Sequence, residues 1–348
     1  MSRRAPSARH LDLRHGAVTM SHGAGGKAMS QLIEGIFLAA FDNPALNRRN
    51  DQADIPLPAG RTVMTTDGYV VSPLFFPGGD IGALAVNGTV NDIAMAGAKP
   101  HYLSAGFILE EGLALADLVR VARSMADAAR QAGVTIVTGD TKVVQRGKGD
   151  GVFITTTGIG VAPDGVNPSA DRARPGDAVV LSGTIGDHGV AVLAQREALS
   201  FQTAIQSDTA ALAGLVADMV AAVPDIHVLR DPTRGGLAAT LNEVADQSQV
   251  GIVVEEAAIP VRGEVRAACE LLGLDPLNIA NEGKLVAICA GDDADRLVAA
   301  MRAHPLGADS AVIGRVVEDD RKFVQMRTGF GGSRLIDWLA GEPLPRIC

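Results

Sequence analysis

The spacing of apolar residues in the first half of the chain predicts alternating strands and helices. Apolar stripes at helical spacing predict helices over 29–41 and 116–132, and another helix begins near Asp80, a typical N-cap residue. Runs of apolar and β-branched residues predict strands over 61–66, 101–109 and 134–138, and a hairpin over 143–162 that turns at 147–151. The first half therefore mixes sheet and helix.

A polar, turn-rich stretch over 163–175 separates this half from the next. Beyond it we expect helices over 188–196, 207–223, 235–246, 264–272 and 292–304, and strands over 178–182, 251–255, 284–290 and 310–317. The sequence thus predicts a layered α+β or α/β fold. Its two domains are expected over 21–165 and 175–335, with an N-terminal tail over 1–20.

Composition narrows the class of protein. The chain has 348 residues, 47% of them hydrophobic and 20% charged, which excludes wholesale disorder. A net charge of −9 disfavours non-specific binding to nucleic acid or to anionic membranes. No apolar run reaches the ~18 residues of a membrane span, and no secretory signal is evident. Three cysteines are too few for a disulfide framework, so we expect a cytoplasmic protein.

Acidic residues recur at the ends of predicted strands and at the starts of turns. They are Asp67, Asp92, Asp140 and Asp231, with Asp51 and Asp54 ahead of them. Mg²⁺ prefers carboxylate, water and phosphate oxygens as ligands. Each residue could instead cap a helix or form an Asx-turn. Their repetition in one setting favours a shared acidic site.

Three further features suit phosphate chemistry. The loop 22–26, followed by Lys27, could cradle phosphate with backbone N–H groups, although its spacing matches neither the P-loop nor the dinucleotide fingerprint, and an ordinary glycine turn is the alternative. Lys142 could neutralise phosphate charge, or be a solvated lysine of the hairpin. Glu282 could act as a general base if burial raises its pKa, or pair with Lys284.

The last eight residues, 341–348, contain two prolines and end in Cys348. They carry no pairing pattern, so we expect an extended, exposed and flexible tail. At ~3.1–3.5 Å per residue it would reach roughly 25 Å. A free exposed cysteine is a liability for oxidation. We therefore interpret Cys348 as a thiol that carries a covalent group into another pocket; the alternative is an incidental terminal cysteine.

With these residues in view, the chain resembles the HypE family of carbamoyl dehydratases, which act in hydrogenase maturation and belong to the aminoimidazole-ribonucleotide-synthetase-like superfamily. The resemblance runs in order from about residue 11 to the last residue. The matching stretches are 21–29, 65–71, 73–82, 87–92, 107–112, 138–145, 230–237, 281–284 and 345–348. The glycine-rich stretches are shared across the superfamily, whereas the terminal Pro345-Arg-Ile-Cys348 is specific to the HypE family.

The resemblance implies a two-domain PurM-like fold, with a homodimer formed through the sheet of the N-terminal domain and ATP bound between the domains with Mg²⁺. It also implies that the carbamoyltransferase HypF carbamoylates the terminal thiol. ATP would then drive dehydration of the thiocarbamate to a thiocyanate, and the cyanide would pass to iron held by the HypC–HypD complex for a nickel–iron hydrogenase.

The resemblance also implies residue roles. Asp51, Asp92 and Asp231 resemble the magnesium–phosphate carboxylates, and Asp51 is the least distinctive of them because Asp54 is a near neighbour. The residues expected at ATP and its phosphates are Gly25, Gly26, Lys27, Asp67, Asn91 and Asp140. Beside Cys348, Lys142 and Glu282 are the candidates for phosphate or thiocarboxamide contact and for proton abstraction.

Two other functions remain open at this point. One is a small-molecule kinase or synthetase of the same superfamily, in which the tail plays no part. The other is a non-enzymatic scaffold that docks maturation partners through its tail. Selenophosphate synthesis is disfavoured, because the loop 22–27 lacks the cysteine or lysine pair of that enzyme's nucleophile segment.

Overall fold

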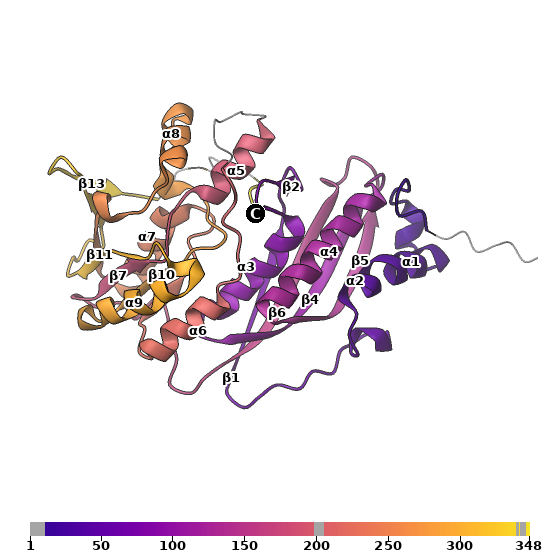
Figure 1. Cartoon of the computed structure of the whole chain (residues 1–348), viewed down its shortest axis with the longest axis horizontal. Coiled ribbons are helices and arrows are strands. Elements are labelled where there is room, and N and C mark those ends of the chain that lie inside the picture. The colour runs from indigo at the N-terminus through magenta and orange to yellow at the C-terminus, as the bar shows by residue number, and fades with distance from the viewer. Residues whose placement is uncertain (1–10, 198–204, 339–340, 342–345) are drawn as a thin grey trace, which may run out of the picture.

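The computed structural model describes residues 11–197, 205–338, 341 and 346–348. It contains two large sheets, each covered by helices (Figure 1). The mixed α/β architecture predicted from the sequence is confirmed. No helix in the described part of the chain combines the length and apolar character that crossing a membrane requires.

The first sheet has four strands in the order β1-β6-β4-β5. Their bounds are β1 Arg61–Tyr69, β4 Lys99–Glu110, β5 Thr135–Val144 and β6 Val152–Ala162. β6 runs antiparallel to β1 and to β4, and β5 runs parallel to β4. The predicted hairpin over 143–162 is therefore wrong: β4 lies between β5 and β6. A parallel pair needs a crossover helix, and that helix carries β5 to the far side of β4.

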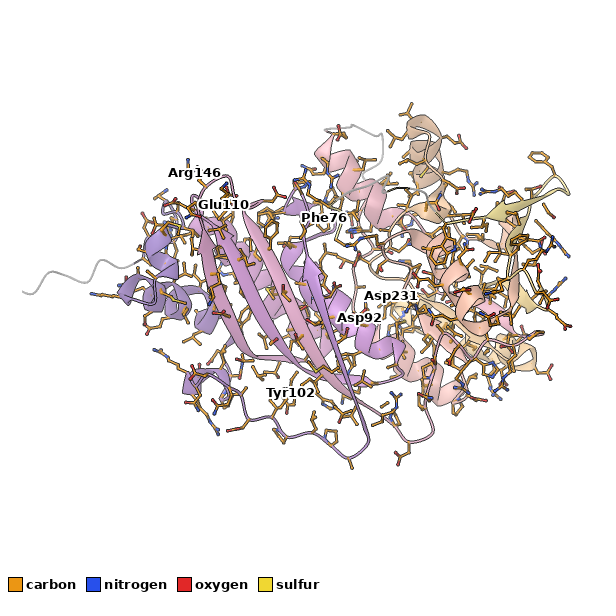
Figure 2. The ribbon with its side chains drawn as sticks, turned by 180° about the vertical axis from the view of Figure 1, so that it is seen from behind. Phe76, Asp92, Tyr102, Glu110, Arg146 and Asp231 are labelled. Carbon is orange, nitrogen blue, oxygen red and sulfur yellow. The ribbon has the colours of Figure 1, made fainter. Side chains whose placement is uncertain are left out.

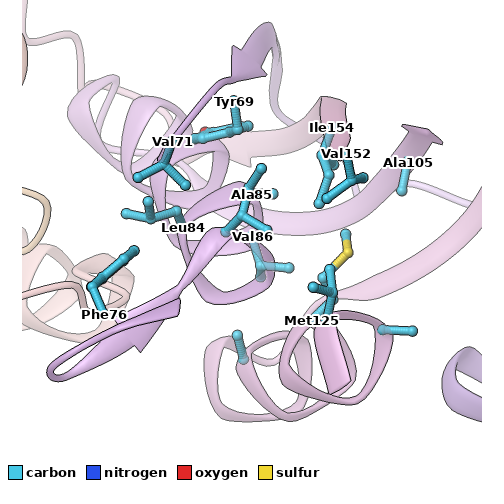
Figure 3. Close-up of a cluster of buried hydrophobic side chains, with 14 of the residues drawn as sticks. Tyr69, Val71, Phe76, Leu84, Ala85, Val86, Ala105, Met125, Val152 and Ile154 are labelled. Atoms are coloured by element: carbon cyan, nitrogen blue, oxygen red, sulfur yellow. The ribbon is translucent and has the colours of Figure 1, made fainter. Parts of the chain in front are cut away.

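Two helices cover one face of this sheet, α3 Ile81–Met95 and α4 Leu115–Ala132 (Figure 1). Asp80 caps α3 as predicted, since its side chain accepts hydrogen bonds from the backbone of Gly82 and Ala83. Figure 3 shows the core between them, where Leu84 and Val86 of α3 and Met125 of α4 meet the sheet. α3 is buried on nearly every side because the second half of the chain covers its other flank.

The predicted helix over 29–41 is present as three consecutive helical segments. They are α1 Lys27–Leu32, the π-helix η2 Ile33–Leu38 and α2 Ala39–Phe41. Short elements complete the described structure: the strands β2 Phe75–Phe76 and β3 Gly79–Asp80, and the 3₁₀ helices η1 Met20–Gly23, η3 Leu46–Arg48, η4 Glu256–Ala258, η5 Pro276–Asn278, η6 Gly291–Asp293 and η7 Pro305–Gly307.

The second sheet has seven strands in the order β13-β12-β9-β11-β7-β10-β8. The strands are β7 Ala178–Leu181, β8 Val228–Arg230, β9 Gly251–Glu255, β10 Val286–Cys289, β11 Ala311–Val317, β12 Val324–Arg327 and β13 Ser333–Ile336. The helices are α5 Asp187–Arg196, α6 Ala213–Ala222, α7 Gly236–Ser248, α8 Gly263–Leu272 and α9 Ala294–Ala303. α6 and α9 share one apolar cluster with the sheet, and α7 shares the other.

The segment 205–212 differs from its prediction, because the helix expected over 207–223 begins only at Ala213. Its backbone is used in tertiary contacts instead: Ser207 N–H donates to Pro77 of the first half at 2.8 Å, and Ala210 N–H donates to Glu282 within the second half at 3.3 Å. Tertiary hydrogen bonds thus replace the first helical turns. The same segment joins the two halves around one continuous apolar core, which contains Leu84 and Val190.

Both described ends of the chain are packed, which corrects the two predicted tails. At the N-terminal end, Val18 is 1% exposed and donates its N–H to Leu113, so the tail predicted over 1–20 is anchored at this residue, although most of its neighbours over 12–20 are exposed. At the C-terminal end, Ile347 is 2% exposed and bridges Val71. The expected exposed tail is therefore wrong for Ile347 and Cys348, whereas Arg346 is exposed; the end of the chain lies between β2 and α5 (Figure 1). Residues 1–10 and 342–345 lie outside the described residues.

Candidate functional site

Four carboxylates from separate elements gather between the two halves of the chain. Asp67 lies on β1, Asp92 on α3, Asp231 directly after β8, and Glu282 in the turn before β10. Figure 2 shows Asp92 and Asp231 next to each other where the halves meet. We call these four residues the carboxylate cluster. Thr65 of β1, beside the cluster, donates its hydroxyl hydrogen to Asp92 Oδ2 at 2.9 Å.

Burial and mutual repulsion perturb these carboxyl groups. Burial and, next, the charge of Asp92 together raise the pKa of Asp231 to about 7. The pKa of Asp92 is raised by burial and then by Asp67, against a hydrogen bond from Thr65. Burial raises the pKa of Glu282 well above its usual value, with Asp208 and Asp231 adding to the effect. The cluster is therefore short of positive charge.

The donor set suits a hard divalent cation, because Mg²⁺ binds carboxylate oxygens and keeps sites for water and phosphate. Within residues 11–197, 205–338 and 346–348, however, no three His, Cys, Asp or Glu side chains already stand close enough to hold a metal ion. Asp51 is exposed in the loop before β1 and is not among the charges that shift the pKa of Asp92 or Asp231. The structure thus brings together two of the three predicted metal ligands.

Asn91 neighbours this cluster but its side chain is already engaged. Its amide donates to Ala210 at 3.0 Å and to the Glu282 carbonyl at 3.4 Å, and its oxygen accepts from Leu212 N–H at 2.7 Å. Asn91 is 2% exposed. It therefore fixes the segment 205–212 and the turn of Glu282, and the expected contact with ATP would have to displace these bonds.

Glu282 is 3% exposed, and its Oε1 has no hydrogen-bond partner in the described part of the chain. The alternative partner, Lys284, pairs instead with Asp208, at 3.2 Å between Nζ and Oδ2. The other oxygen of Asp208 accepts the Glu282 N–H at 3.0 Å. Sequence reasoning missed Asp208, since it lies in a stretch predicted as helix and meets Lys284 only through the fold.

The terminal thiol lies at the same site. Arg234 Nη2 is 3.5 Å from Cys348 Sγ. Burial raises the pKa of the thiol to about 12, with the charge of Glu282 as the next cause and Arg234 opposing it. Val70 N–H holds the main-chain oxygen of Cys348 at 3.1 Å. The thiol predicted to travel is therefore docked beside the carboxylate cluster, and Arg234 is a contact that the sequence analysis did not find.

The remaining predicted residues form a second group at the opposite edge of the first sheet. Gly25 and Gly26 line a cavity with Gly139 of β5, and Lys27, the first residue of α1, is exposed. Lys142 pairs with Asp140 at 2.6 Å, and both side chains are more than half exposed.

The register of the sheet separates this group from the carboxylate cluster. The row Asp140–Gly106–Thr155–Gly68 crosses all four strands, so β5 and β1 are three strand spacings, about 14 Å, apart. Lys142 lies opposite Ile108 on the face that α3 and α4 leave uncovered, whereas Asp67 shares the α3 face with Thr65. Within one chain, therefore, Lys142, Asp140 and the glycine loop do not lie near Glu282.

Comparison with known proteins identifies the relatives of this chain. The AIR synthase related N-terminal domain matches residues 49–162, and the corresponding C-terminal domain matches residues 174–327. The carbamoyl dehydratase HypE of Azotobacter vinelandii is 66% identical over 338 residues, covering 97% of this chain and 99% of that protein.

Two solved structures are similar over most of their length. A crystal structure of hydrogenase maturation protein HypE in complex with ATP has a TM-score of 0.91 and 54% identity, covering 94% of this chain and 99% of that one. A crystal structure of a HypE–HypF complex has a TM-score of 0.79 and 49% identity, covering 88% and 99%. By fold, by both domain matches and by identity along its length, the chain belongs to the AIR synthase related proteins and, among them, to the carbamoyl dehydratase HypE family.

Proposed function

We propose that this chain is an ATP-dependent carbamoyl dehydratase that converts an S-carbamoyl group on its own Cys348 into a thiocyanate. The observation that carries the proposal is the docked thiol: Cys348 lies with Arg234 in the site of Glu282, a buried carboxylate with an oxygen that has no partner among the described residues. The thiocyanate carbon would supply the cyanide ligand for the iron of a nickel–iron hydrogenase.

The reaction balances with ATP as the only co-substrate. The amide oxygen of the S-carbamoyl group attacks the γ-phosphorus of ATP and ADP leaves. The two amide protons are then removed while the C–O bond breaks, so that the oxygen departs with phosphate and the S–C≡N group forms. Phosphorylation is needed because an amide oxygen alone is a poor leaving group. The products are the thiocyanate, ADP and phosphate.

The chain's own residues suit this sequence of steps. Glu282 is the proposed proton acceptor, because a buried carboxyl group with a raised pKa is a stronger base than an exposed one. Arg234 carries a fixed positive charge next to Sγ and would hold negative charge that develops on the phosphorylated group. Asp92 and Asp231 are the proposed protein ligands of Mg²⁺, with phosphate and water oxygens as the others and Asp67 close by, and the ion would offset the phosphate charge; Asp51 stays a prediction.

A homodimer is also part of the proposal. The uncovered face of the first sheet carries Met64, 68% exposed, and Ile108, 41% exposed, on the same face as Lys142. Apolar side chains on an unpartnered sheet face favour contact with another surface. A second copy seated there would give Lys142, Asp140 and the glycine loop 22–27 new neighbours, and would let them take part in ATP binding away from their own Glu282.

Two partners follow from the chemistry and from the relatives. A carbamoyltransferase must load the thiol, and the solved HypE–HypF complex supports HypF in that role. The HypC–HypD complex is the proposed acceptor of the cyanide, by resemblance alone. These exchanges would take place in the cytoplasm.

ATP turnover that depends on the loaded thiol tests the proposal. With HypF and carbamoyl phosphate present, the chain should release phosphate from ATP only after Cys348 is carbamoylated. Cys348→Ala should bind ATP and release none beyond the HypF background. A chain lacking 344–348 that retained substrate-dependent ATP turnover would favour a small-molecule kinase. Absence of turnover with the carbamoylated protein would favour the scaffold.

A further inference from the structure

A buried imidazole outside the proposed chemistry contacts the C-terminal residues. His188, the second residue of α5, is fully buried. Its Nε2 lies 2.8 Å from the carbonyl oxygen of Ile347, and its Nδ1 lies 2.8 Å from Ser207 Oγ. The ring of Phe76 packs edge-on against it, with centroids 5.5 Å apart. Three elements distant in sequence thus fix one ring beside the chain terminus, which lies between β2 and α5 (Figure 1).

The partners of the ring determine where its proton lies. A carbonyl oxygen only accepts, so Nε2 must carry the hydrogen that it donates to Ile347. In a neutral ring Nδ1 then accepts, and the Ser207 hydroxyl donates to it. Ser207 Oγ in turn accepts the Thr209 N–H at 3.1 Å. All four groups are satisfied by one arrangement, with a neutral imidazole, and burial lowers the pKa of His188 in the direction that keeps it neutral.

This chain of hydrogen bonds ends one peptide unit from the reacting thiol. The Ile347 carbonyl belongs to the peptide group that links Ile347 to Cys348, so holding it restricts the rotation of that group. Other bonds hold the same strand: Val70 N–H reaches the Cys348 main-chain oxygen, and Arg196 reaches the Arg346 carbonyl at 2.7 Å. Among these contacts, the bond from His188 is the one that a wholly buried side chain makes. Its acceptor is the carbonyl directly before the cysteine.

We infer that His188 is a positioning residue: its Nε2–H holds the Ile347 carbonyl and so presents the group carried by Cys348 to Glu282. His188 does not touch the reacting atoms. Its effect on turnover rests on the proposed dehydratase function, whereas its effect on the docked position of the tail does not.

Amide substitutions separate this role from simple packing. The amide nitrogen of glutamine reaches the position of Nε2, whereas that of asparagine reaches the position of Nδ1. His188→Gln should therefore keep the bond to Ile347 and retain turnover within about threefold. His188→Asn should lose about tenfold in kcat, the typical effect of one hydrogen bond, with ATP affinity unchanged. A purely space-filling role would make the two variants alike. His15→Ala, at an exposed histidine, is the matched control.

Alkylation of Cys348 by iodoacetamide measures docking without ATP, HypF or turnover. We expect His188→Asn to raise its rate severalfold and His188→Gln to leave it near the parent value. Cys269 and Cys289 are 1% and 0% exposed, and their lack of labelling reports an intact fold. Should His188→Asn label them, Ser207→Ala takes its place, because it removes only the hydroxyl that orients the ring and should also speed Cys348 labelling.

The inference would be overturned if Cys348 were alkylated at the same rate in the parent chain and in His188→Asn, or in Ser207→Ala where that variant replaces it. Equal kcat values for the Asn and Gln variants would overturn it as well. Faster alkylation combined with no dehydration in any chain, the parent included, would leave His188 as the residue that docks the tail and would reject the proposed function instead.

Discussion

Asp208 Oδ1 accepts the backbone N–H of Glu282 at 3.0 Å, while its Oδ2 lies 3.2 Å from Lys284 Nζ. One carboxylate therefore fixes the turn that carries Glu282 and also neutralises the lysine that follows it. The side chain of Glu282 is left in the carboxylate cluster with Oε1 unpaired among the described residues. Glu282 is therefore a base with a raised pKa.

Asp208→Asn should lower the rate of dehydration about tenfold. Asparagine still accepts the Glu282 N–H but no longer neutralises Lys284, so the lysine becomes available to Glu282 and lowers its pKa. Activity of a base rises with pH through its pKa, so the acidic limb of the pH–rate profile should move to lower pH. Asp309→Asn, an exposed neighbour in the same cavity, is the control. An unmoved acidic limb would refute this role of Asp208.

Glu282→Gln should lower turnover by a factor of about 10² or more, since general-base catalysis contributes 10²–10⁴. ATP affinity should change little, because the glutamine keeps the volume and the main-chain contacts of the turn. Single-turnover rates and ATP titration separate these effects. Glu264→Gln on α8 serves as the control. An unchanged rate would reassign Glu282 to a structural turn.

Asp231→Asn should raise the melting temperature by a few degrees at pH 8. The folded chain raises the pKa of Asp231 from 3.8 to about 7, by burial and by the charge of Asp92, so folding favours the protonated form. The ionised form is therefore unfavourable above pH 7, and its cost falls as the pH drops toward 3.8. The gain should shrink at pH 5, and also on adding Mg²⁺ with ATP. Asp218→Asn, at an exposed aspartate of α6, is the control; a gain that grew at pH 5 would contradict the assignment.

Met64→Lys should dissociate the proposed homodimer, because a charge would be buried in an apolar contact on the uncovered face of the first sheet. Light scattering coupled to gel filtration measures the change. Leu271→Lys provides the matched control, since Leu271 is 75% exposed on α8, in the other half of the chain. A Met64→Lys chain with the parent's mass in solution would exclude this face as the interface.

The order of strands shows where sequence patterns stop being informative. Local periodicity predicted helix 116–132 to within a residue of α4, because an amphipathic helix carries its whole signal within itself. The same reasoning predicted a hairpin over 143–162, since nothing within that stretch reveals that β4 pairs with both β5 and β6. Pairing partners are decided by the crossover through α4, which is a long-range property.

The site shows the same division. Asp67, Asp92, Asp231 and Glu282 could be predicted because acidic residues recur along the sequence in similar local contexts. The setting predicted for two of them is wrong, since Asp67 lies within β1 and Asp92 within α3 rather than at strand ends or turns. The residues that hold them could not: Asp208 lies 76 positions from Lys284, and His188 lies 159 positions from Ile347. The packed position of Ile347 and Cys348 depends on such distant partners, so proline content alone suggested an exposed tail.

Intact-mass analysis of the full chain with HypF, carbamoyl phosphate and ATP is the most direct test of the central claim. The account predicts that the chain first gains one carbamoyl group and then, only when ATP is present, loses one molecule of water, with both changes mapped to Cys348. A carbamoylated chain that keeps its mass in the presence of ATP, or a loss of water from the Cys348→Ala chain, would contradict it.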